Sequence, residues 1–98
     1  MSKAATPKKK KVTLSFEGEP GSEVQVAGSF NDWSINDKKK AKVMKEKDAG
    51  HFSINLFLPV GEHEYKFYSN GEWIVDPKAE KKAPNRFGTY NAVIEVSE

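Results

Sequence analysis

The residues best suited to binding a ligand with both apolar and polar surfaces meet in one short stretch, KFYSNGEW, at residues 66–73. This stretch places Lys66 and Trp73 on either side of the two-residue step Asn70-Gly71. Both residues of such a step can adopt the positive φ that a type I′ turn requires, so the stretch predicts a tight β-hairpin. A tryptophan beside an exposed turn makes this hairpin the first candidate site.

The predicted turn also fixes which side chains share a face of the hairpin. Opposed residues point to the same face, and neighbours along a strand point to opposite faces. The pairs expected from an Asn-Gly loop are Ser69 with Glu72, Tyr68 with Trp73, Phe67 with Ile74 and Lys66 with Val75. Because an unpaired lysine is rarely buried, the face with Tyr65, Phe67 and Ile74 should meet the core. Lys66, Tyr68 and Trp73 should therefore look outward.

Two further segments add candidates to this outer face. In the last strand Tyr90, Ala92, Ile94 and Val96 form the apolar set, which leaves Thr89, Val93, Asn91 and Glu95 to point outward. The second tryptophan, Trp33, lies in the string SFNDWS, which is rich in turn residues and predicts a strand end or a loop. Both an exposed ring and a plug for the end of the fold remain open for Trp33.

Alternating apolar residues predict the strands that carry these side chains. The two-residue period of half-buried strands appears at residues 12–16, 24–26, 52–58, 63–67, 73–75 and 90–96. Gly, Pro, Asn and Asp separate these runs, and no segment has a sustained helical period. The lysine-rich segment 36–48 predicts a loop with a short strand, with a short helix as the alternative. The pattern favours an all-β fold, an immunoglobulin-like antiparallel β-sandwich of about seven strands.

Length and composition limit what this sandwich can be. A chain of 98 residues suits one domain, and we expect a disordered basic tail at residues 1–10 followed by the folded domain at 11–98. The absence of cysteine excludes disulfides and thiolate metal sites, and we expect neither a metal nor a cofactor. There is no apolar run long enough to span a membrane and no secretory signal, so no membrane partner and a cytoplasmic location are expected.

Charge is distributed unevenly along the chain. Residues 1–11 hold five lysines and no acid, and residues 36–48 hold six lysines against three acids. The remainder has five basic against eleven acidic residues, so the body of the domain is acidic. Nucleic-acid binding needs a basic stripe on a folded face. A lysine tail more often serves solubility or weak nonspecific contacts, so no nucleic-acid partner is expected.

An exposed indole on a rigid sheet suits a pyranose ring, which has an apolar C–H face surrounded by hydroxyls. Tryptophan supplies contact area with little rotamer entropy to lose. Lys66 offers three donors, and the carboxamide of Asn91 offers both a donor and an acceptor. Each neutral hydrogen bond contributes only about 0.5–1.5 kcal/mol net, so binding should lie roughly between micromolar and millimolar.

Four strings in order resemble a known family over residues 12–96. They are VQVAGSFNDWS, LPVGEHEYKFYSNGEW, VDP and NRFGTYNAVIEV. Together they closely resemble carbohydrate-binding modules of family 48, which include the glycogen-binding domain of the AMP-activated protein kinase beta subunit and the early-set domains of isoamylases and branching enzymes. The resemblance implies an immunoglobulin-like sandwich that binds α-1,4-linked glucans such as glycogen and starch. It also implies a separate glycogen-metabolism enzyme or kinase chain as a partner.

The resemblance further implies roles for both tryptophans and for Lys66. In kinase-subunit members of this family two tryptophans stack on glucose rings, and they correspond to Trp33 and Trp73. The lysine of the YKF string corresponds to Lys66 and would contact sugar hydroxyls. The family's usual Asp-Gly turn is Asn70-Gly71 in this sequence.

The string NRFGTYNAV carries the remaining implied site residues. The asparagine after the G-T-x step corresponds to Asn91, with Thr89 nearby. The family places a bulky apolar residue, often leucine, before that glycine, where it inserts into the turn of the glucan. Here that residue is Phe87, and a phenylalanine can stack instead of threading. The usual Asn-Asn is Asn91-Ala92.

The residues favour a non-catalytic role over an enzyme. Glycoside hydrolysis needs two carboxylates flanking a cleft, whereas Asp32 and Asp76 are better interpreted as turn residues. His51 and His63 are unpaired with any nucleophile or metal set. The alternative is a protein-interaction module that uses the same outer face, because exposed tryptophan also marks protein interfaces. Lys66 and Asn91 beside both tryptophans favour the sugar.

Overall fold

Strands account for nearly all the regular structure of this chain. The computed structural model describes residues 9–97. Apart from a short 3-10 turn, η1 (Ser29–Asn31), its elements are β1 (Lys9–Glu17), β2 (Val24–Gly28), β3 (Lys42–Val43), β4 (Lys45–Asp48), β5 (His51–Pro59), β6 (Gly61–Ser69), β7 (Glu72–Ile74), β8 (Lys81–Pro84) and β9 (Tyr90–Val96). The described residues contain no helix with the length and apolar character needed to cross a membrane.

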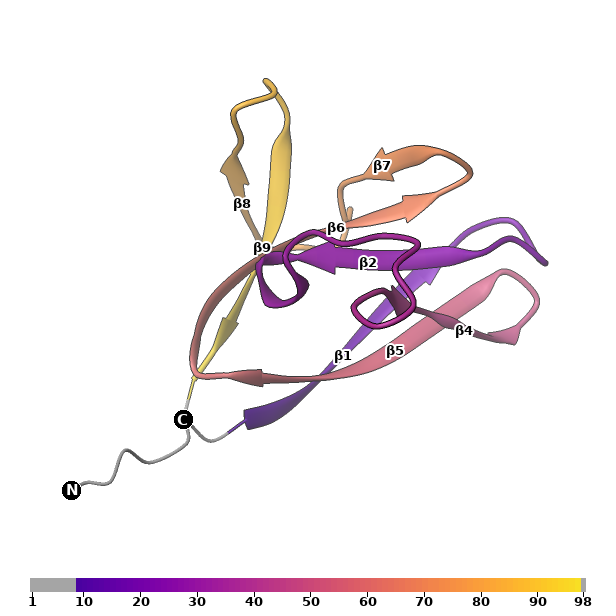
Figure 1. The fold of residues 1–98 in the computed structure, drawn as a ribbon, viewed down its shortest axis with the longest axis horizontal. Helices are drawn as coiled ribbons and strands as arrows, with labels where there is room; N and C mark the ends of the chain where they lie inside the picture. The colour runs from indigo at the N-terminus through magenta and orange to yellow at the C-terminus, as the bar shows by residue number, and fades with distance from the viewer. Residues whose placement is uncertain (1–8, 98) are drawn as a thin grey trace.

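Two antiparallel sheets form the sandwich (Figure 1). The smaller sheet has the order β1-β5-β4, and the larger has the order β3-β2-β6-β9-β8 with β7 also paired to β6. Strand β6 is central, because β2 occupies one of its edges while β9 and β7 share the other. The prediction of an all-β antiparallel sandwich is confirmed. The lysine-rich segment contributes two short strands, β3 and β4, and no helix.

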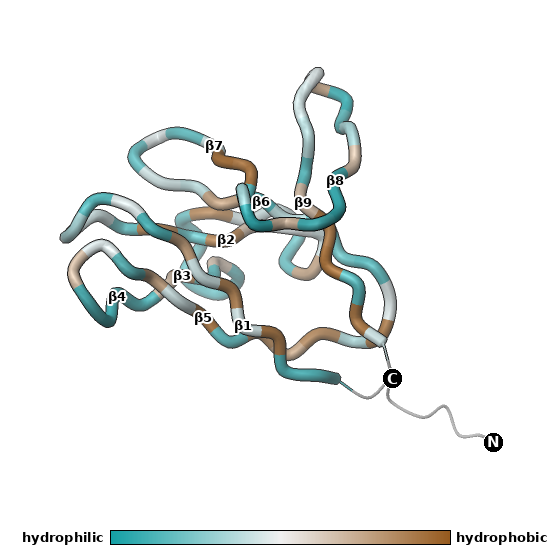
Figure 2. Tube along the Cα trace, turned by 180° about the vertical axis from the view of Figure 1, so that it is seen from behind, coloured by the Kyte–Doolittle hydropathy of each residue, from teal (hydrophilic) through white to brown (hydrophobic). Residues whose placement is uncertain are grey.

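The core lies between the two sheets and follows the predicted alternation. Apolar stretches recur along β1, β5, β7 and β9, whereas the turns between strands are mostly hydrophilic (Figure 2). The Phe67 ring of β6 is fully buried and lies 4.9 Å from the Phe16 ring of β1, measured between centroids. The buried apolar cluster comprises Leu14, Val24, Val26, Met44, Phe52, Leu56, Leu58, Tyr65, Phe67, Ala92 and Val96.

The β6–β7 turn forms with the predicted register. Ser69 lies opposite Glu72, Tyr68 opposite Trp73 and Phe67 opposite Ile74. The φ angles of Asn70 (53°) and Gly71 (77°) are both positive, as the turn requires. The predicted pair of Lys66 with Val75 is absent because β7 ends at Ile74.

Strand β1 begins at Lys9, within the segment that the sequence assigned to the tail; residues 1–8 lie outside the described residues. One expectation at the end of a strand needs correction. Tyr90 is 54% exposed instead of facing the core. At this end β9 pairs only with β8, and their hairpin projects away from the smaller sheet, so nothing in that sheet covers the ring (Figure 1).

Candidate ligand-binding face

Three aromatic rings form one cluster on the outer face of the larger sheet. The Trp73 ring of β7 lies 6.4 Å from the Trp33 ring in an edge-to-face arrangement, and 5.0 Å from the Tyr68 ring of β6. Trp73 is 43% exposed, and Trp33 is half-buried. The structure thus brings together two candidates that are far apart in sequence. Tyr68, placed on this face by the register, supports Trp73 from the neighbouring strand.

A compact turn after β2 brings Trp33 to this cluster. The backbone N–H of Gly28 donates to Asn31 Oδ1 at 2.9 Å, and the N–H of Trp33 donates to the Gly28 carbonyl at 2.9 Å. Asp32 and Trp33 both have left-handed φ, 56° and 57°, which reverses the chain. Gly28 itself permits the close approach of β2 to β6, because a Cβ there would lie 2.2 Å from the Glu64 carbonyl oxygen.

Asn31 holds the rest of this loop and was not identified as important from the sequence. Its side chain is buried, and Nδ2 donates to the carbonyls of Ser34 at 3.2 Å and Lys40 at 3.0 Å. Asp32, interpreted as a turn residue, forms an ion pair with Lys40 at 3.0 Å on the surface. The only sequence signal for this arrangement was the density of turn-forming residues in SFNDWS.

Lys66 and Asn91 lie on the predicted outer face but are not open to solvent. They are 9% and 7% exposed. Lys66 Nζ donates to Thr89 Oγ1 at 3.2 Å, and Asn91 Nδ2 donates to Glu64 Oε1 at 2.9 Å. The expectation that these two side chains are freely exposed is wrong, because Lys66 is bonded to the turn of the β8–β9 hairpin, and Asn91 is bonded to that turn through Asn85 and to β6 through Glu64.

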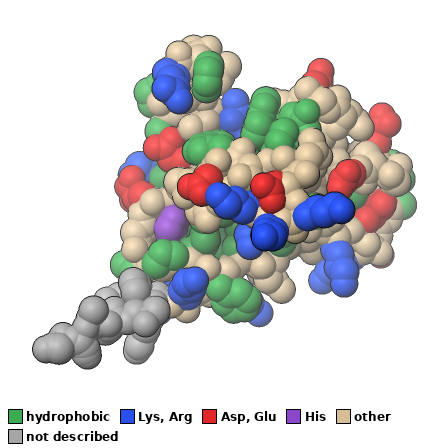
Figure 3. All heavy atoms as spheres, viewed as in Figure 1, with side chains coloured by type: hydrophobic (Ala, Val, Ile, Leu, Met, Phe, Trp, Pro, Cys, Tyr) green, Lys and Arg blue, Asp and Glu red, His purple; other side chains and the backbone are tan. Residues whose placement is uncertain are grey.

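Phe87 stands at the tip of the β8–β9 hairpin. Its side chain is 79% exposed, and the Arg86 guanidinium lies 5.6 Å from the ring centroid, within cation–π range. The Phe87 N–H donates to Asn85 Oδ1 at 2.9 Å, which ties the tip to the start of the turn. Apolar side chains are visible where the β6–β7 and β8–β9 hairpins project from the larger sheet. Most of the Lys and Arg side chains of this view lie below them (Figure 3).

The titratable residues considered for catalysis have other contacts. His51 Nδ1 lies 3.7 Å from a Glu17 carboxylate oxygen, and His63 Nε2 lies 2.8 Å from the Pro59 carbonyl. Within residues 9–97, no group of three or more His, Cys, Asp or Glu side chains is arranged to hold a metal ion.

Asp76 forms the turn predicted for it and also joins the loop after β7 to the core. Its Oδ1 accepts the N–H of Lys78 at 2.9 Å, and its Oδ2 accepts the Tyr65 hydroxyl at 2.5 Å. Burial, and then the hydrogen bond to this carboxylate, raise the pKa of Tyr65 well above its ordinary value. The buried hydroxyl therefore remains a donor at any physiological pH.

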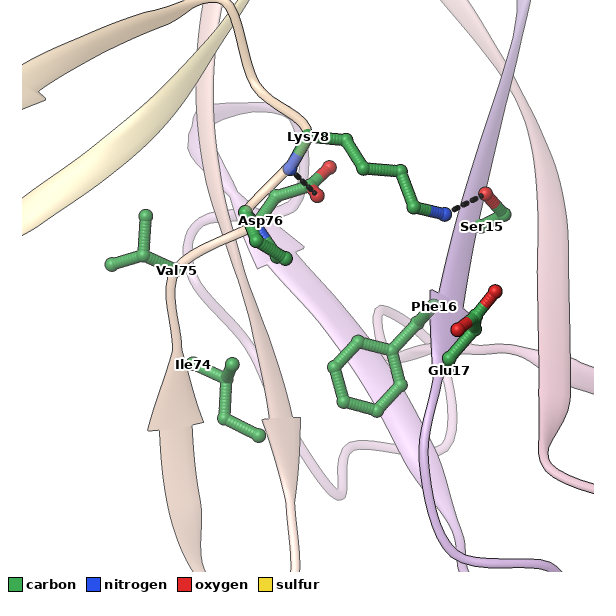
Figure 4. A pocket seen from close by; sticks show the side chains of 8 residues that line it. Ser15, Phe16, Glu17, Ile74, Val75, Asp76 and Lys78 are labelled. Atoms are coloured by element: carbon green, nitrogen blue, oxygen red, sulfur yellow. Dashed lines mark hydrogen bonds between the residues drawn. The ribbon is translucent and has the colours of Figure 1, made fainter.

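A shallow hollow lies beside this loop, on the core side of β7 (Figure 4). Ile74 and Phe16 face one another across it, and Lys78 Nζ reaches over to donate to Ser15 Oγ of β1 at 2.8 Å. Because Ile74 and Trp73 are neighbours on one strand, their side chains point to opposite faces. The hollow is therefore separate from the aromatic cluster.

Comparison with known proteins places these features in context. The family described as "Glycogen recognition site of AMP-activated protein kinase" matches residues 10–98. The chain is 41% identical over 78 residues to the 5'-AMP-activated protein kinase subunit beta-2 of Mus musculus, covering 80% of this chain and 26% of that protein. It is 41% identical over 76 residues to subunit beta-1 of Bos taurus, covering 78% of this chain and 25% of that protein. The chain thus spans about a quarter of the length of these curated relatives.

Proposed function

This chain belongs to the family of glycogen recognition sites of AMP-activated protein kinase, and from that membership we propose that it binds α-1,4-linked glucan without catalysing a reaction on it. The observation that carries the proposal is the contact between Trp33 and Trp73, whose rings lie 6.4 Å apart. The cluster stands next to a polar network that contains Lys66, Thr89 and Asn91. Apolar rings beside fixed donors and acceptors match a ligand with apolar ring faces and hydroxyl edges.

The proposed roles are divided among the aromatic cluster, β6 and the β8–β9 hairpin. Trp73 and Trp33 supply the surfaces on which glucose rings stack, and Tyr68 supports Trp73. Lys66 keeps two of its three donors for the ligand, because one is used by Thr89. Asn91 likewise has one N–H and one lone pair left after its contacts with Glu64 and Asn85. Phe87, the most exposed of the large apolar residues, contacts the glucan from the hairpin tip.

The chain matches about a quarter of the length of kinase beta subunits. We therefore propose that the module targets a glycogen-metabolism enzyme or kinase chain to glucan. The domain limits 11–98 and the cytoplasmic location stay predictions. A protein-interaction role for the same face would not need the Lys66–Thr89–Asn91 group, so it is the weaker alternative.

An NMR titration with maltoheptaose tests the proposed function. We expect amide and indole shifts near Trp33, Lys66, Trp73 and Asn91, with the outer face of β1 and β5 unaffected. If these signals did not shift, glucan binding would be rejected and the protein-interaction alternative would remain.

Migration in glycogen-containing native gels tests the stacking ring separately. Trp73→Ala should lose its retardation, because fully burying a large apolar side chain contributes about 1.5–3 kcal/mol. Phe57→Ala is a matched control, since Phe57 is 61% exposed on the other sheet. Equal retardation of Trp73→Ala and wild type would remove Trp73 from the site.

A further inference from the structure

Asn85 is the centre of a hydrogen-bond network in the β8–β9 hairpin. This half-buried residue precedes the turn, and its backbone N–H donates to the Thr89 carbonyl at 2.9 Å. Its side chain contacts Phe87, Thr89 and Asn91. None of the sequence patterns pointed to this residue.

The orientation of the Asn85 carboxamide follows from the backbone. The N–H groups of Phe87 (2.9 Å) and Thr89 (3.2 Å) both donate to its Oδ1. Two backbone donors require an acceptor, so the oxygen must face the turn and the amide cannot be reversed. The Nδ2 group then points toward β9, where it donates to Thr89 Oγ1 at 2.8 Å and Asn91 Oδ1 at 2.9 Å.

This orientation is passed on to the proposed ligand residues. Because Asn91 Oδ1 accepts from Asn85, the Asn91 Nδ2 group is turned to Glu64 Oε1 at 2.9 Å. Thr89 Oγ1 accepts from both Asn85 Nδ2 and Lys66 Nζ, at 2.8 and 3.2 Å, which uses both of its lone pairs. The Thr89 hydroxyl also donates to Asn85 Oδ1 at 3.1 Å, so its hydrogen bonds are all made within the protein. The orientations of Thr89 and Asn91 therefore depend on Asn85.

We propose that Asn85 is a positioning residue for glucan binding, with a separate task for each end of its carboxamide. The oxygen holds the turn that carries Phe87, and the nitrogen orients Asn91, which keeps one N–H and one lone pair for the ligand. The inference rests on the proposed glucan binding and adds to it a residue that need not touch the sugar.

The variant Asn85→Asp separates the two tasks. An aspartate carboxylate has nearly the same shape and still accepts from the N–H groups of Phe87 and Thr89. It puts an oxygen opposite Asn91 Oδ1, where wild type has a donor. If Asn91 turned to donate to the aspartate, its own oxygen would face the Glu64 carboxylate instead. Either orientation leaves one contact unmade, whereas Asn85→Ala removes both tasks at once.

Titration of the variants with maltoheptaose, followed by NMR, gives the readout. We expect Asn85→Asp to bind about 2- to 10-fold more weakly than wild type, as for the loss of one hydrogen bond. Its Cα signals at Phe87 and Gly88, which report the backbone conformation of the turn, should stay in place while the Asn91 side-chain amide signals shift. Asn85→Ala should lose at least as much affinity and also shift the Phe87 and Gly88 signals.

Two results would overturn the inference. One is wild-type affinity for Asn85→Asp, which would leave Asn85 as a turn residue with no effect on the ligand groups. The other is displacement of Phe87 and Gly88 in Asn85→Asp, which would mean that the two ends do not act separately. Asn55→Ala, which removes a carboxamide bonded to Thr13 on the smaller sheet, should bind like wild type. Failure of wild type itself to bind would reject the proposed function instead.

Discussion

The two hairpins that project from the larger sheet present their side chains in different ways. Strand pairing between β6 and β7 directs Trp73, because Tyr68 lies opposite it next to the Asn70-Gly71 turn. In the β8–β9 hairpin, contacts between side chains direct the polar groups, and Asn91 is held by residues 6 and 27 positions away. The direction of Trp73, which is set by the backbone, should tolerate side-chain substitutions nearby. The polar groups of the β8–β9 hairpin depend on each residue of their hydrogen-bond network.

The largest effect is expected from a substitution in the core of β6, the strand that supports both hairpins. Phe67→Ala should lower the free energy of unfolding by about 3–5 kcal/mol, because a fully buried ring is replaced by a cavity in β6. Urea denaturation measures the loss. Phe57→Ala, at a 61% exposed ring, should change stability by less than about 0.5 kcal/mol. Similar losses in both variants would show that β6 is not the common support.

A smaller effect is expected where β2 meets β6. Gly28→Ala places a Cβ 2.2 Å from the Glu64 carbonyl oxygen, so the strands must separate, at a cost of about 1–3 kcal/mol. Because Trp33 N–H bonds to the Gly28 carbonyl, the Trp33 indole signal should shift as well. Thermal unfolding and NMR measure the two changes. An unfolding midpoint of Gly28→Ala equal to that of wild type would contradict the close approach of β2 to β6.

The turn itself allows the sharpest comparison with Asn85. Gly71→Ala meets no neighbouring atom but needs a left-handed conformation at φ 77°, so it should destabilise by about 1 kcal/mol. Stability and maltoheptaose affinity should fall together, since the same backbone carries Trp73. Asn70→Gly is the matched control and should be nearly neutral, because glycine adopts positive φ readily. If Gly71→Ala lost affinity but kept full stability, the β6–β7 hairpin would not depend on its backbone more than the β8–β9 hairpin does.

The last expected effect is a loss of stability at alkaline pH, at the contact that ties the segment between the hairpins to the core. The pKa of Tyr65 is raised by burial and by Asp76, so the folded state keeps a proton that the unfolded chain releases above about pH 10. Stability should therefore decline above that pH by up to about 1.4 kcal/mol per pH unit from this group. Tyr65→Phe should lack this component in pH-dependent urea denaturation. Parallel declines in both proteins would contradict a protonated Tyr65.

Local patterns predicted much of the fold, and their failures have clear causes. The Asn-Gly turn and strict alternation were sufficient to pair β6 with β7 and to place Phe67 inside. Alternation alone misplaced Tyr90, because it cannot show where the opposite sheet ends. It also left Lys66 exposed, because the cover comes from a hairpin more than twenty residues further along the chain.

The sequence by itself determined most of the strands, the tight turn at Asn70-Gly71 and the outward direction of Trp73, since each depends on neighbours within a few residues. It did not predict β8 (Lys81–Pro84), which has no apolar alternation. The tertiary structure decided the contact of Trp33 with Trp73 and the orientation of Asn91 between Asn85 and Glu64. Those arrangements need segments distant in sequence to approach within hydrogen-bond or van der Waals range. Such distances depend on how the sheets pair and are not encoded in any local period.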